Sequence, residues 1–334
     1  MKRTFLSITA LALVTGLIAV TIIGCVKEPK PTETAVSGDT ENHMTWFISE
    51  DHTTLDISGE GAMTSEACDT WFTYKQTIAN IRIGEGITRI DNDVFEDCYN
   101  LTAIDVAPSN PNYCSVNGVL FDKNQSELIR CPQAKEGAYT VPGSVEKIRA
   151  HAFMNCYKLT KVTIGEHVSN GIFFPYCGRL KAILVAPENT YYSSEDGVLY
   201  NKDKTVLIQC PHDKKGAFTI PSSVKRIDTE AFYICSLTSI TIGDHVEEIG
   251  DRAFMNSDLE MITLGKGIKQ IGDEAFMNCV FTDETYIHAP TPPVVGQDAF
   301  YTTNNRMVIC VPKSSLEAYQ TAAYWKELKI RGIE

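Results

Sequence analysis

Apolar and polar residues alternate over short runs that recur along this chain of 334 residues. Two clear examples are Val162-Thr163-Ile164 and Ile240-Thr241-Ile242, each followed at once by a glycine. A period of two is typical of a β-strand with one buried face, because successive side chains point to opposite sides. The pattern therefore predicts many short strands, with aliphatic side chains inward and threonine outward, each ended by a glycine or proline turn.

A longer cassette carries these strands. It reads Ala-Phe-x-x-Cys, then Leu, then Ile-x-Ile-Gly, and its best copies begin at Ala152 and Ala231. Related copies surround Phe95, Phe174, Phe254, Phe276 and Phe300, and the spacings from Phe153 to Phe174, Phe232 to Phe254 and Phe254 to Phe276 are 21, 22 and 22 residues. This period is typical of leucine-rich-repeat solenoids, in which each coil buries its apolar face against its neighbours. We expect a β-rich α/β solenoid, a leucine-rich-repeat superhelix with short strands on one face and short helical or 3-10 turns on the other.

A second period of 79 residues lies on top of the first. It carries Phe95 onto Phe174 and Phe153 onto Phe232, so a tandem duplication explains it best. Each copy holds the same insertion, at 108–137 and 187–216, in which two apolar runs flank a polar turn. The runs are Val119-Leu120-Phe121 with Leu128-Ile129-Arg130, and Val198-Leu199-Tyr200 with Leu207-Ile208-Gln209. Each pair of runs predicts an inserted β-hairpin beside the coil.

The first 24 residues have the pattern of a bacterial lipoprotein signal peptide. Lys2 and Arg3 give a basic start, an apolar run covers 5–23, and Gly24-Cys25 resembles a lipobox, in which Cys25 receives the lipid. The alternative is an uncleaved membrane anchor, because the apolar run is nearly long enough to span a bilayer. Residues 25–42 are polar and contain prolines, so we expect a flexible tether there.

The repeat resembles that of a known bacterial family. The run 271–279, Ile-Gly-Asp-Glu-Ala-Phe-Met-Asn-Cys, is a close copy of the coil of the BspA-like leucine-rich repeats, and the match extends from about Trp46 to the end of the chain. The departures are Ser257 in place of cysteine and Phe173-Phe174 in place of Ala-Phe. The resemblance implies an N-terminal cap at 43–76, a solenoid at 77–300 and a C-terminal cap at 301–334, since the ends of a solenoid core must be covered. It also implies surface exposure and contact with host or microbial macromolecules.

Composition narrows the class of partner. Hydrophobic residues make up 43% of the chain and charged residues 22%, which is ordinary for a folded protein. The formal net charge is −12. Nucleic-acid binding needs clustered lysine and arginine to neutralise phosphate, so the acidic balance argues against a nucleic-acid partner.

Cysteines are the most frequent candidate for chemistry, but their pattern favours a structural role. Ten follow Cys25, and five of these share one repeat position: Cys98, Cys156, Cys177, Cys235 and Cys279. We expect a buried column of reduced thiols, because a chain with a large repeating core does not need a disulfide framework. The alternative is a set of disulfides between neighbouring coils of an exported protein.

The remaining motifs favour a non-catalytic protein without metal or cofactor. The sequence has no Cys-x-x-Cys pair, no nucleophile elbow and no phosphate loop. His167 and His245 recur in polar turns after strands, where turn geometry explains their repetition. The turn Asp122-x-Asn124-x-Ser126 lacks the glycine and the distal glutamate of a calcium loop.

The alternation places one set of strand side chains outside the coils, where they form the candidate ligand face. These residues are Lys161, Thr163, Leu184, Ser239, Thr241, Met261, Thr263 and Tyr286. Together with the predicted signal peptide, this face indicates an exported, lipid-anchored protein of the cell envelope, exposed at the outer membrane. We expect it to bind or adhere to a host or microbial surface protein or glycan. The alternatives are a structural or accessory subunit of an envelope complex and an enzyme with an unrecognised site.

Replacing Cys25 with alanine tests the lipid anchor. In a native-like bacterial host, we expect Cys25→Ala to abolish incorporation of labelled fatty acid and to block maturation or release the chain from membranes, because the Cys25 thiol is the attachment point for the lipid. Fatty-acid labelling and membrane fractionation measure both effects, with Cys310→Ala as the control that leaves the lipobox intact. A Cys25→Ala variant that still carries the label would show that the lipobox interpretation is wrong.

Overall fold

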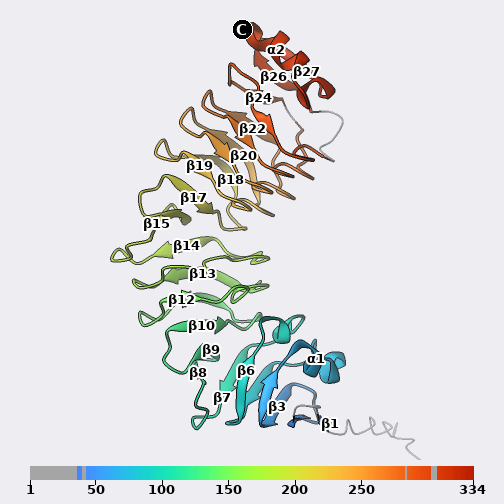
Figure 1. Cartoon of the computed structure of the whole chain (residues 1–334), viewed down its shortest axis with the longest axis vertical. Helices are drawn as coiled ribbons and strands as arrows, with labels where there is room; N and C mark the ends of the chain where they lie inside the picture. The colour runs from blue at the N-terminus through green and yellow to red at the C-terminus, as the bar shows by residue number, and fades with distance from the viewer. Residues whose placement is uncertain (1–35, 40–42, 283, 302–306) are drawn as a thin grey trace, which may run out of the picture. The chain divides into compact units, whose positions relative to one another are not determined.

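A computed structural model describes residues 36–39, 43–282, 284–301 and 307–334. The predicted signal peptide, Cys25 and the first part of the predicted tether lie outside the described residues. Within the described ranges, no helix is both long and apolar enough to cross a membrane. The described residues form coils that follow one another in chain order (Figure 1).

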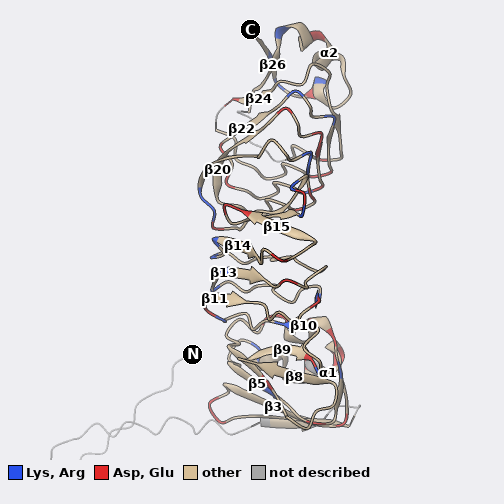
Figure 2. Cartoon of the chain, turned by 90° about the vertical axis from the view of Figure 1, so that its left-hand side faces the viewer, with Lys and Arg blue, Asp and Glu red and all other residues tan. Residues whose placement is uncertain are grey.

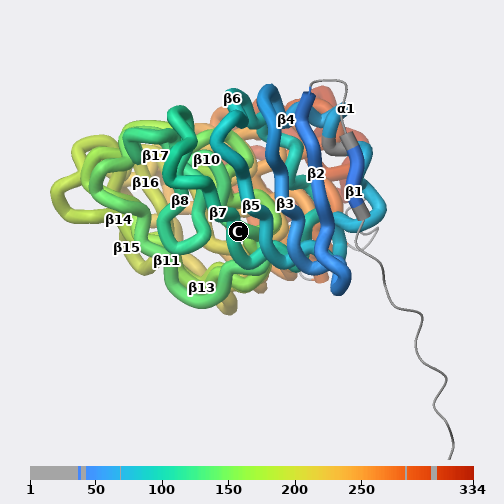
Figure 3. Tube along the Cα trace, turned by 90° about the horizontal axis from the view of Figure 1, so that it is seen from below, coloured from blue at the N-terminus to red at the C-terminus, as the bar shows by residue number. Residues whose placement is uncertain are grey.

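The first coils are built on a five-stranded sheet with the order β1-β2-β3-β5-β7, whose strands lie side by side in Figure 3. The strands are β1 (Val36–Asp39), β2 (Met44–Ile48), β3 (Thr54–Gly59), β5 (Asn80–Ile83) and β7 (Ala103–Val106). The pairs β1-β2 and β2-β3 are antiparallel, whereas β3-β5 and β5-β7 are parallel. Residues 36–39 therefore pair with β2, and the flexible tether that we expected up to residue 42 does not include them. This pairing covers the edge of β2, which would otherwise expose a row of unpaired backbone groups.

Small elements close the core of the first coils. They are β4 (Gly61–Met63), β6 (Ile87–Ile90), α1 (Ser65–Cys68) and η1 (Asp69–Tyr74). Thr64 caps α1, because its hydroxyl oxygen accepts a hydrogen bond from the Ala67 N–H at 3.2 Å. The Trp71 ring is buried and meets the Trp46 ring edge-to-face, with 6.1 Å between centroids. These two rings fill the end of the solenoid core.

Two parallel ladders run through the repeats. The first ladder contains the strands that the apolar–polar alternation predicts, and its sheets have the orders β11-β13-β14 and β18-β20-β22-β24-β26-β27. Its strands are β11 (Gly137–Thr140), β13 (Leu159–Ile164), β14 (Ala182–Val185), β18 (Gly216–Thr219), β20 (Leu237–Ile242), β22 (Met261–Leu264), β24 (Thr285–Ile287), β26 (Ile309–Pro312) and β27 (Ile330–Ile333). The second ladder consists of two-residue strands that the sequence did not predict: β12 (Lys147–Ile148), β19 (Arg226–Ile227), β21 (Glu248–Ile249), β23 (Gln270–Ile271) and β25 (Val294–Val295).

Burial along the strands confirms the predicted orientation. In β13, Leu159, Val162 and Ile164 are fully buried, whereas Lys161 is exposed and Thr163 is half-buried. The buried aliphatic side chains pack against their counterparts in neighbouring coils. A β-solenoid with little helix is therefore the observed architecture.

Both inserted hairpins are confirmed, each with one additional strand. The predicted pairs are β9 (Val119–Asp122) with β10 (Glu127–Arg130), and β16 (Val198–Asn201) with β17 (Val206–Gln209). A third antiparallel strand precedes each pair, β8 (Tyr113–Val116) and β15 (Tyr192–Glu195). Because β10 and β17 also pair in parallel with β12 and β19, each insertion joins the second ladder.

Phenylalanine rings form columns at one corner of the coils. The centroids of Phe153 and Phe174 are 4.9 Å apart. In the second column, Phe232, Phe254, Phe276 and Phe300 follow one another at 4.7, 5.1 and 5.0 Å, with nearly parallel rings. This spacing is close to the separation of roughly 4.8 Å between neighbouring strands, so each coil contributes one ring per rung.

The corner turns differ from the expected helical turns. At Phe95 the corner is a 3-10 helix, η2 (Asn92–Phe95), but in the coils of Phe153, Phe232, Phe254 and Phe276 it is a hydrogen-bonded turn. The residue before the alanine has a positive φ in each of these coils: His151 64°, Glu230 56°, Arg252 53° and Glu274 54°. A left-handed residue interrupts a right-handed helix, so the expectation of helical or 3-10 turns is wrong for these coils.

The repeat-position cysteines are buried beside the phenylalanine columns. Among the described side chains, nine cysteines are free, including all five of this set. Burial raises the pKa of Cys98 and of Cys279 to about 11, because an apolar site disfavours the thiolate. The Cys235 thiol donates a hydrogen bond to Cys210 Sγ at 3.6 Å, and no disulfide joins the two residues. The arrangement agrees with the buried-thiol hypothesis.

A helical segment closes the far end of the core. It comprises η3 (Lys313–Ser315), α2 (Leu316–Thr321) and η4 (Trp325–Glu327), and β27 follows it. The Tyr319 hydroxyl donates to the Ala289 carbonyl at 3.0 Å, and the Trp325 indole N–H donates to the Pro293 carbonyl at 2.8 Å. Both rings are buried, so their polar atoms need these partners.

Removal of one ring from the second column should destabilise the solenoid. We expect Phe254→Ala to lower the free energy of unfolding by about 3–5 kcal/mol, because it leaves a cavity between the rings of Phe232 and Phe276. Urea unfolding measures the change. Phe72→Ala is the matched control, because Phe72 is 55% exposed and its loss should change the free energy by less than about 0.5 kcal/mol. Equal losses in the two variants would contradict the role of the column.

Candidate functional site

The predicted ligand face lies on the outer side of the first ladder. Lys161, Thr241 and Met261 are exposed, and Thr163, Leu184, Ser239, Thr263 and Tyr286 are half-buried. The parallel register brings several of them together. Thr163 pairs with Leu184, Ser239 with Met261, and Thr263 lies between Thr241 and Tyr286.

The structure divides this face into two parts. Lys161, Thr163 and Leu184 belong to the sheet β11-β13-β14, and the other five belong to the sheet that begins at β18. The second insertion lies between them in the chain, and the Ile183 N–H of β14 donates to the Gly197 carbonyl of this insertion at 2.8 Å. The eight residues therefore do not share one continuous sheet.

Tyr286, at the far end of this face, already makes contacts within the chain. The Tyr286 hydroxyl donates to Glu284 Oε2 at 2.9 Å, and Arg331 forms an ion pair with Glu284 Oε1. These two donors hold the pKa of the Glu284 carboxyl below its usual range. The hydroxyl is therefore committed to the fold, and the ring of Tyr286 is what remains available for binding.

Charged side chains are spread over the coils. Figure 2 shows lysine and arginine interspersed with aspartate and glutamate. Several of them pair between neighbouring coils, for example Lys269 with Glu247 at 2.6 Å and Lys158 with Glu136 at 2.8 Å. Exposed pairs of this kind contribute little to stability, but they neutralise charge locally.

A further site, which the sequence did not predict, lies beside the turn of each insertion that replaces the phenylalanine corner of a regular coil. We call this turn a short corner. In regular coils the phenylalanine N–H donates to the alanine carbonyl of the next coil, as from Phe232 to Ala253 at 2.7 Å. In each insertion the backbone N–H of a cysteine continues this ladder. The Cys210 N–H donates to the Ala231 carbonyl at 2.7 Å, and the Cys131 N–H donates to the Ala152 carbonyl at 2.8 Å. A small side chain thus stands where other coils carry a ring and a protruding turn.

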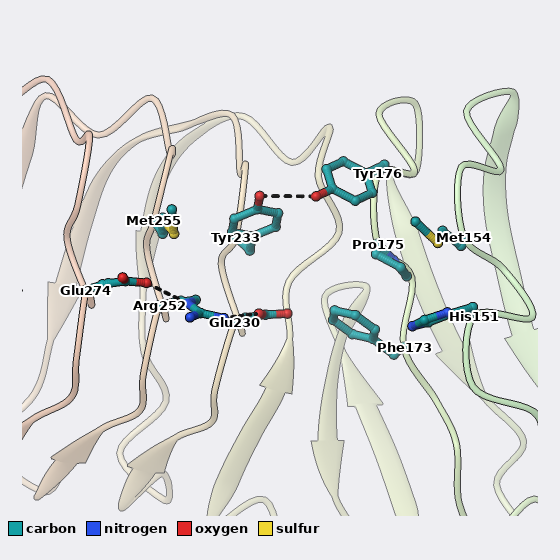
Figure 4. Close-up of a pocket in the computed structure, with 10 residues that line it drawn as sticks. All are labelled: His151, Met154, Phe173, Pro175, Tyr176, Glu230, Tyr233, Arg252, Met255 and Glu274. Atoms are coloured by element: carbon teal, nitrogen blue, oxygen red, sulfur yellow. Dashed lines mark hydrogen bonds and ion pairs between the residues drawn. The ribbon is translucent and has the colours of Figure 1, made fainter. Parts of the chain in front are cut away.

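The short corner of the second insertion leaves a pocket of about 390 Å³ between the corners of Phe174 and Phe232. We call it the notch. Phe173, Pro175 and Tyr176 line one side of it, together with His151 and Met154 of the coil before. Glu230, Tyr233 and Arg252, from the coils that follow, line the other side. In Figure 4 the two groups face each other across the gap. Tyr176 and Tyr233 meet edge-to-face, with 5.9 Å between ring centroids and 3.4 Å between hydroxyl oxygens.

An ion-paired row forms one side of the notch. Arg252 Nε lies 2.6 Å from Glu274 Oε2, and Arg252 Nη1 lies 3.8 Å from Glu230 Oε1. These carboxylates raise the pKa of the Arg252 guanidinium, with the hydrogen bond to Glu274 as the main cause. The three side chains therefore form an alternating series of acceptor, donor and acceptor, with one net negative charge.

The corner that the duplication aligns with the notch in the first insertion carries different side chains. Asp93, Glu96 and His151 bring possible metal-ligand atoms within 4.8 Å of one another there. Both Asp93 and His151 are exposed, and the buried guanidinium of Arg130 donates to the His151 carbonyl at 2.7 Å. A fixed cation so close opposes the binding of a metal cation. We assign no function to this cluster.

Buried polar side chains support the short corners. The Gln209 Oε1 atom accepts a hydrogen bond from the Phe174 N–H at 3.1 Å, and Gln133 Nε2 donates to the Phe95 carbonyl at 3.1 Å. His212, which the duplication aligns with Gln133, is only 3% exposed. Burial lowers the pKa of His212 to about 4, because charging an imidazole in the core is costly.

The sequence holds a partial signal for the notch. The 58 residues from Phe174 to Phe232 exceed two regular periods, which shows that coils without Ala-Phe lie between them. Tyr176 and Tyr233 flank this gap, but they lie 57 residues apart and their contact depends on the corner geometry. The alternation of apolar and polar residues predicts only the strands, so it could not predict which side chains meet at the corners.

Comparisons with known proteins agree with the fold. A family model described as the BspA type leucine-rich repeat region matches in six copies, over residues 66–193, 128–214 and 212–331. A leucine-rich repeat protein from Eubacterium ventriosum is 23% identical, with a TM-score of 0.61 over 90% of this chain and 85% of that chain. A leucine rich cell surface protein from Faecalibacterium prausnitzii is 19% identical, with a TM-score of 0.51 over 91% and 96%. No curated protein matches the chain.

Buried His212 should make stability depend on pH. Its pKa is about 4 in the folded chain and about 6.5 when unfolded, so between these values the unfolded chain binds more protons and stability falls as the pH is lowered. Lowering the pH should therefore reduce the free energy of unfolding. We expect His212→Gln, which introduces the glutamine found at the aligned position Gln133, to diminish this reduction by on the order of 3 kcal/mol. Urea unfolding at pH 7 and pH 4.5 measures it. His167→Gln, at an exposed histidine, is the control, and identical pH profiles for wild type and His212→Gln would contradict the prediction.

Proposed function

The chain belongs to the BspA-type leucine-rich repeat family, and on this premise we propose that it is an exported, lipid-anchored protein that binds a macromolecule at the bacterial cell surface. The Gly24-Cys25 junction supports the lipid anchor. The similar protein from Faecalibacterium prausnitzii is described as a cell surface protein, which supports the location. The partner in this proposal is a host or microbial surface protein or glycan, and the membrane is the outer one.

The observation that carries the proposal is the register of the outward strand positions. Ser239 beside Met261, and Thr241, Thr263 and Tyr286 in one row, occupy neighbouring rungs that lie roughly 4.8 Å apart. The aliphatic side chains of the same strands fill the core, so the outward positions are free to vary without loss of the fold. A row of such positions presents a surface wide enough for a macromolecule.

The positions of the perturbed titratable groups support a non-catalytic role. Catalysis uses groups of shifted pKa that a substrate reaches in a cleft. Here His212, Cys98 and Cys279 have strongly shifted pKa values, but their side chains are buried in the core. The carboxylates of the notch, in contrast, are engaged with Arg252. The arrangement favours binding over bond making.

Three outward residues test the strand face. We expect replacement of Leu184, Met261 and Tyr286 with alanine to weaken a ligand by about tenfold or more, because large side chains at the centre of a contact carry most of its energy. The ligand comes from a screen of the purified protein against extracellular-matrix proteins, glycans and bacterial surface material. The variant should still fold, because the buried aliphatic side chains of the strands are unchanged, although the loss of the hydrogen bond from Tyr286 to Glu284 should lower its melting temperature slightly.

Val280→Ala with Val294→Ala is the matched control, because both valines are exposed, at 57% and 72%, and lie outside this face. Unchanged affinity in the triple variant would move the site to the insertions or the notch. Substrate turnover that is lost on changing one acidic residue would reject the non-catalytic proposal. Stoichiometric capture of one envelope protein would favour a structural subunit instead.

A further inference from the structure

The notch has the size and construction of a small-ligand site. Its volume of about 390 Å³ lies within the range of roughly 300–1,000 Å³ that is usual for ligand pockets. The hydrogen bond from Cys210 to Ala231 fixes the short corner at its base. The opening therefore results from the backbone of the insertion rather than from the positions of side chains.

Aromatic side chains line both sides of the notch. Tyr176 is 44% exposed and Tyr233 is half-buried, and their edge-to-face contact restrains both rings. Phe173 and Met255, both half-buried, add apolar surface. Tyrosine rings offer a large contact area with few torsions to immobilise. Flat, partly restrained surfaces of this kind complement the C–H faces of a saturated ring.

The polar side of the notch presents both donors and acceptors. Arg252 donates a hydrogen bond to Glu274, and Glu230, whose Oε1 lies 3.8 Å from Arg252 Nη1, offers further acceptor oxygens. The side chains of Glu230, Glu274 and Arg252 are 27%, 31% and 52% exposed, so atoms of all three reach the solvent. A hydroxyl group both donates and accepts, so neighbouring hydroxyls on one ring match this alternation.

Charge selects among the classes of ligand. An anion would meet the net negative charge of the row, and a basic side chain would have to displace Arg252 from the carboxylates with which it is paired. A neutral ligand rich in hydroxyl groups meets neither penalty. We propose that the notch is a binding site for a neutral oligosaccharide, stacked on Tyr176 and Tyr233 and hydrogen-bonded to the row of Glu230, Arg252 and Glu274. This inference rests on the proposed binding function and names the ligand class of one site.

The first insertion offers an internal comparison. The duplication aligns Tyr176 with Asp97 and Tyr233 with Met154. The equivalent corner therefore lacks aromatic residues at these two positions and carries Asp93 and Glu96 instead. Its own tyrosines lie at other positions, where the Tyr157 hydroxyl donates to the Tyr99 carbonyl at 2.9 Å. Without tyrosines at the two aligned positions, the first copy should not retain an oligosaccharide, so binding should require the second copy alone.

The test uses the full-length protein in detergent on an array that carries neutral, sialylated and sulfated forms of the same oligosaccharide cores, together with a lysine-rich peptide. We expect binding to neutral forms, and the double variant Tyr176→Ala/Tyr233→Ala should weaken it about tenfold or more. Tyr191→Ala is the control, since Tyr191 is 54% exposed outside the notch. The variant Tyr176→Phe/Tyr233→Phe keeps both rings and should retain binding, which separates loss of stacking from loss of folding.

Salt dependence distinguishes the ligand classes. Binding of a neutral oligosaccharide should change little between about 0.1 M and about 1 M salt, whereas binding of a charged ligand should weaken strongly. Preference for sialylated or sulfated forms, or peptide binding that the tyrosine variant abolishes, would overturn the inference. If the protein captures surface proteins but no oligosaccharide, the inference fails and the proposed function stands. If it captures neither, both fail.

Discussion

The backbone hydrogen bond from the corner phenylalanine of a regular coil to the alanine carbonyl of the next coil is the interaction on which the rest of the solenoid depends. It recurs at 2.7 Å from Phe232, Phe254 and Phe276. In these coils the residue before the alanine has a left-handed φ, as at Glu230, Arg252 and Glu274. The phenylalanine ring then falls directly above its counterpart, and the corner holds coils together on the side opposite the strands. Strand pairing alone would leave that side of the core open.

The insertions show which part of this arrangement is essential. Cys131 and Cys210 keep the hydrogen bond and give up the ring, so the ladder continues while the column of rings is interrupted. Side-chain atoms of Gln133 and Gln209 then satisfy the backbone groups that the missing corner leaves behind. A buried polar group without a partner is costly, which explains why amides lie in a core that is otherwise apolar. The notch is the space that this substitution leaves at the surface.

The sequence predicted the parts of the fold that have a period and missed those that do not. Alternation around Val162 and Ile240 predicted the first ladder, and the paired apolar runs predicted β9-β10 and β16-β17. The two-residue strands of the second ladder are too short to show alternation, and β15 has the polar sequence Tyr-Ser-Ser-Glu. The left-handed φ of the corners could not be predicted, because His151, Glu230 and Arg252 stand at positions where glycine or asparagine would indicate such a conformation. The strand-face residues followed from alternation, but their division between two sheets depends on a contact between β14 and the insertion.

The tandem duplication gives the protein two copies of one architectural frame, and their linings have diverged. One copy gathers Asp93, Glu96 and His151, and the other pairs Tyr176 with Tyr233. In a solenoid each coil contacts only its neighbours, so a change in one copy leaves the folding of the other almost untouched. Such a chain can acquire a new surface chemistry in one repeat while its twin preserves the old one, a freedom that a single closed core does not offer.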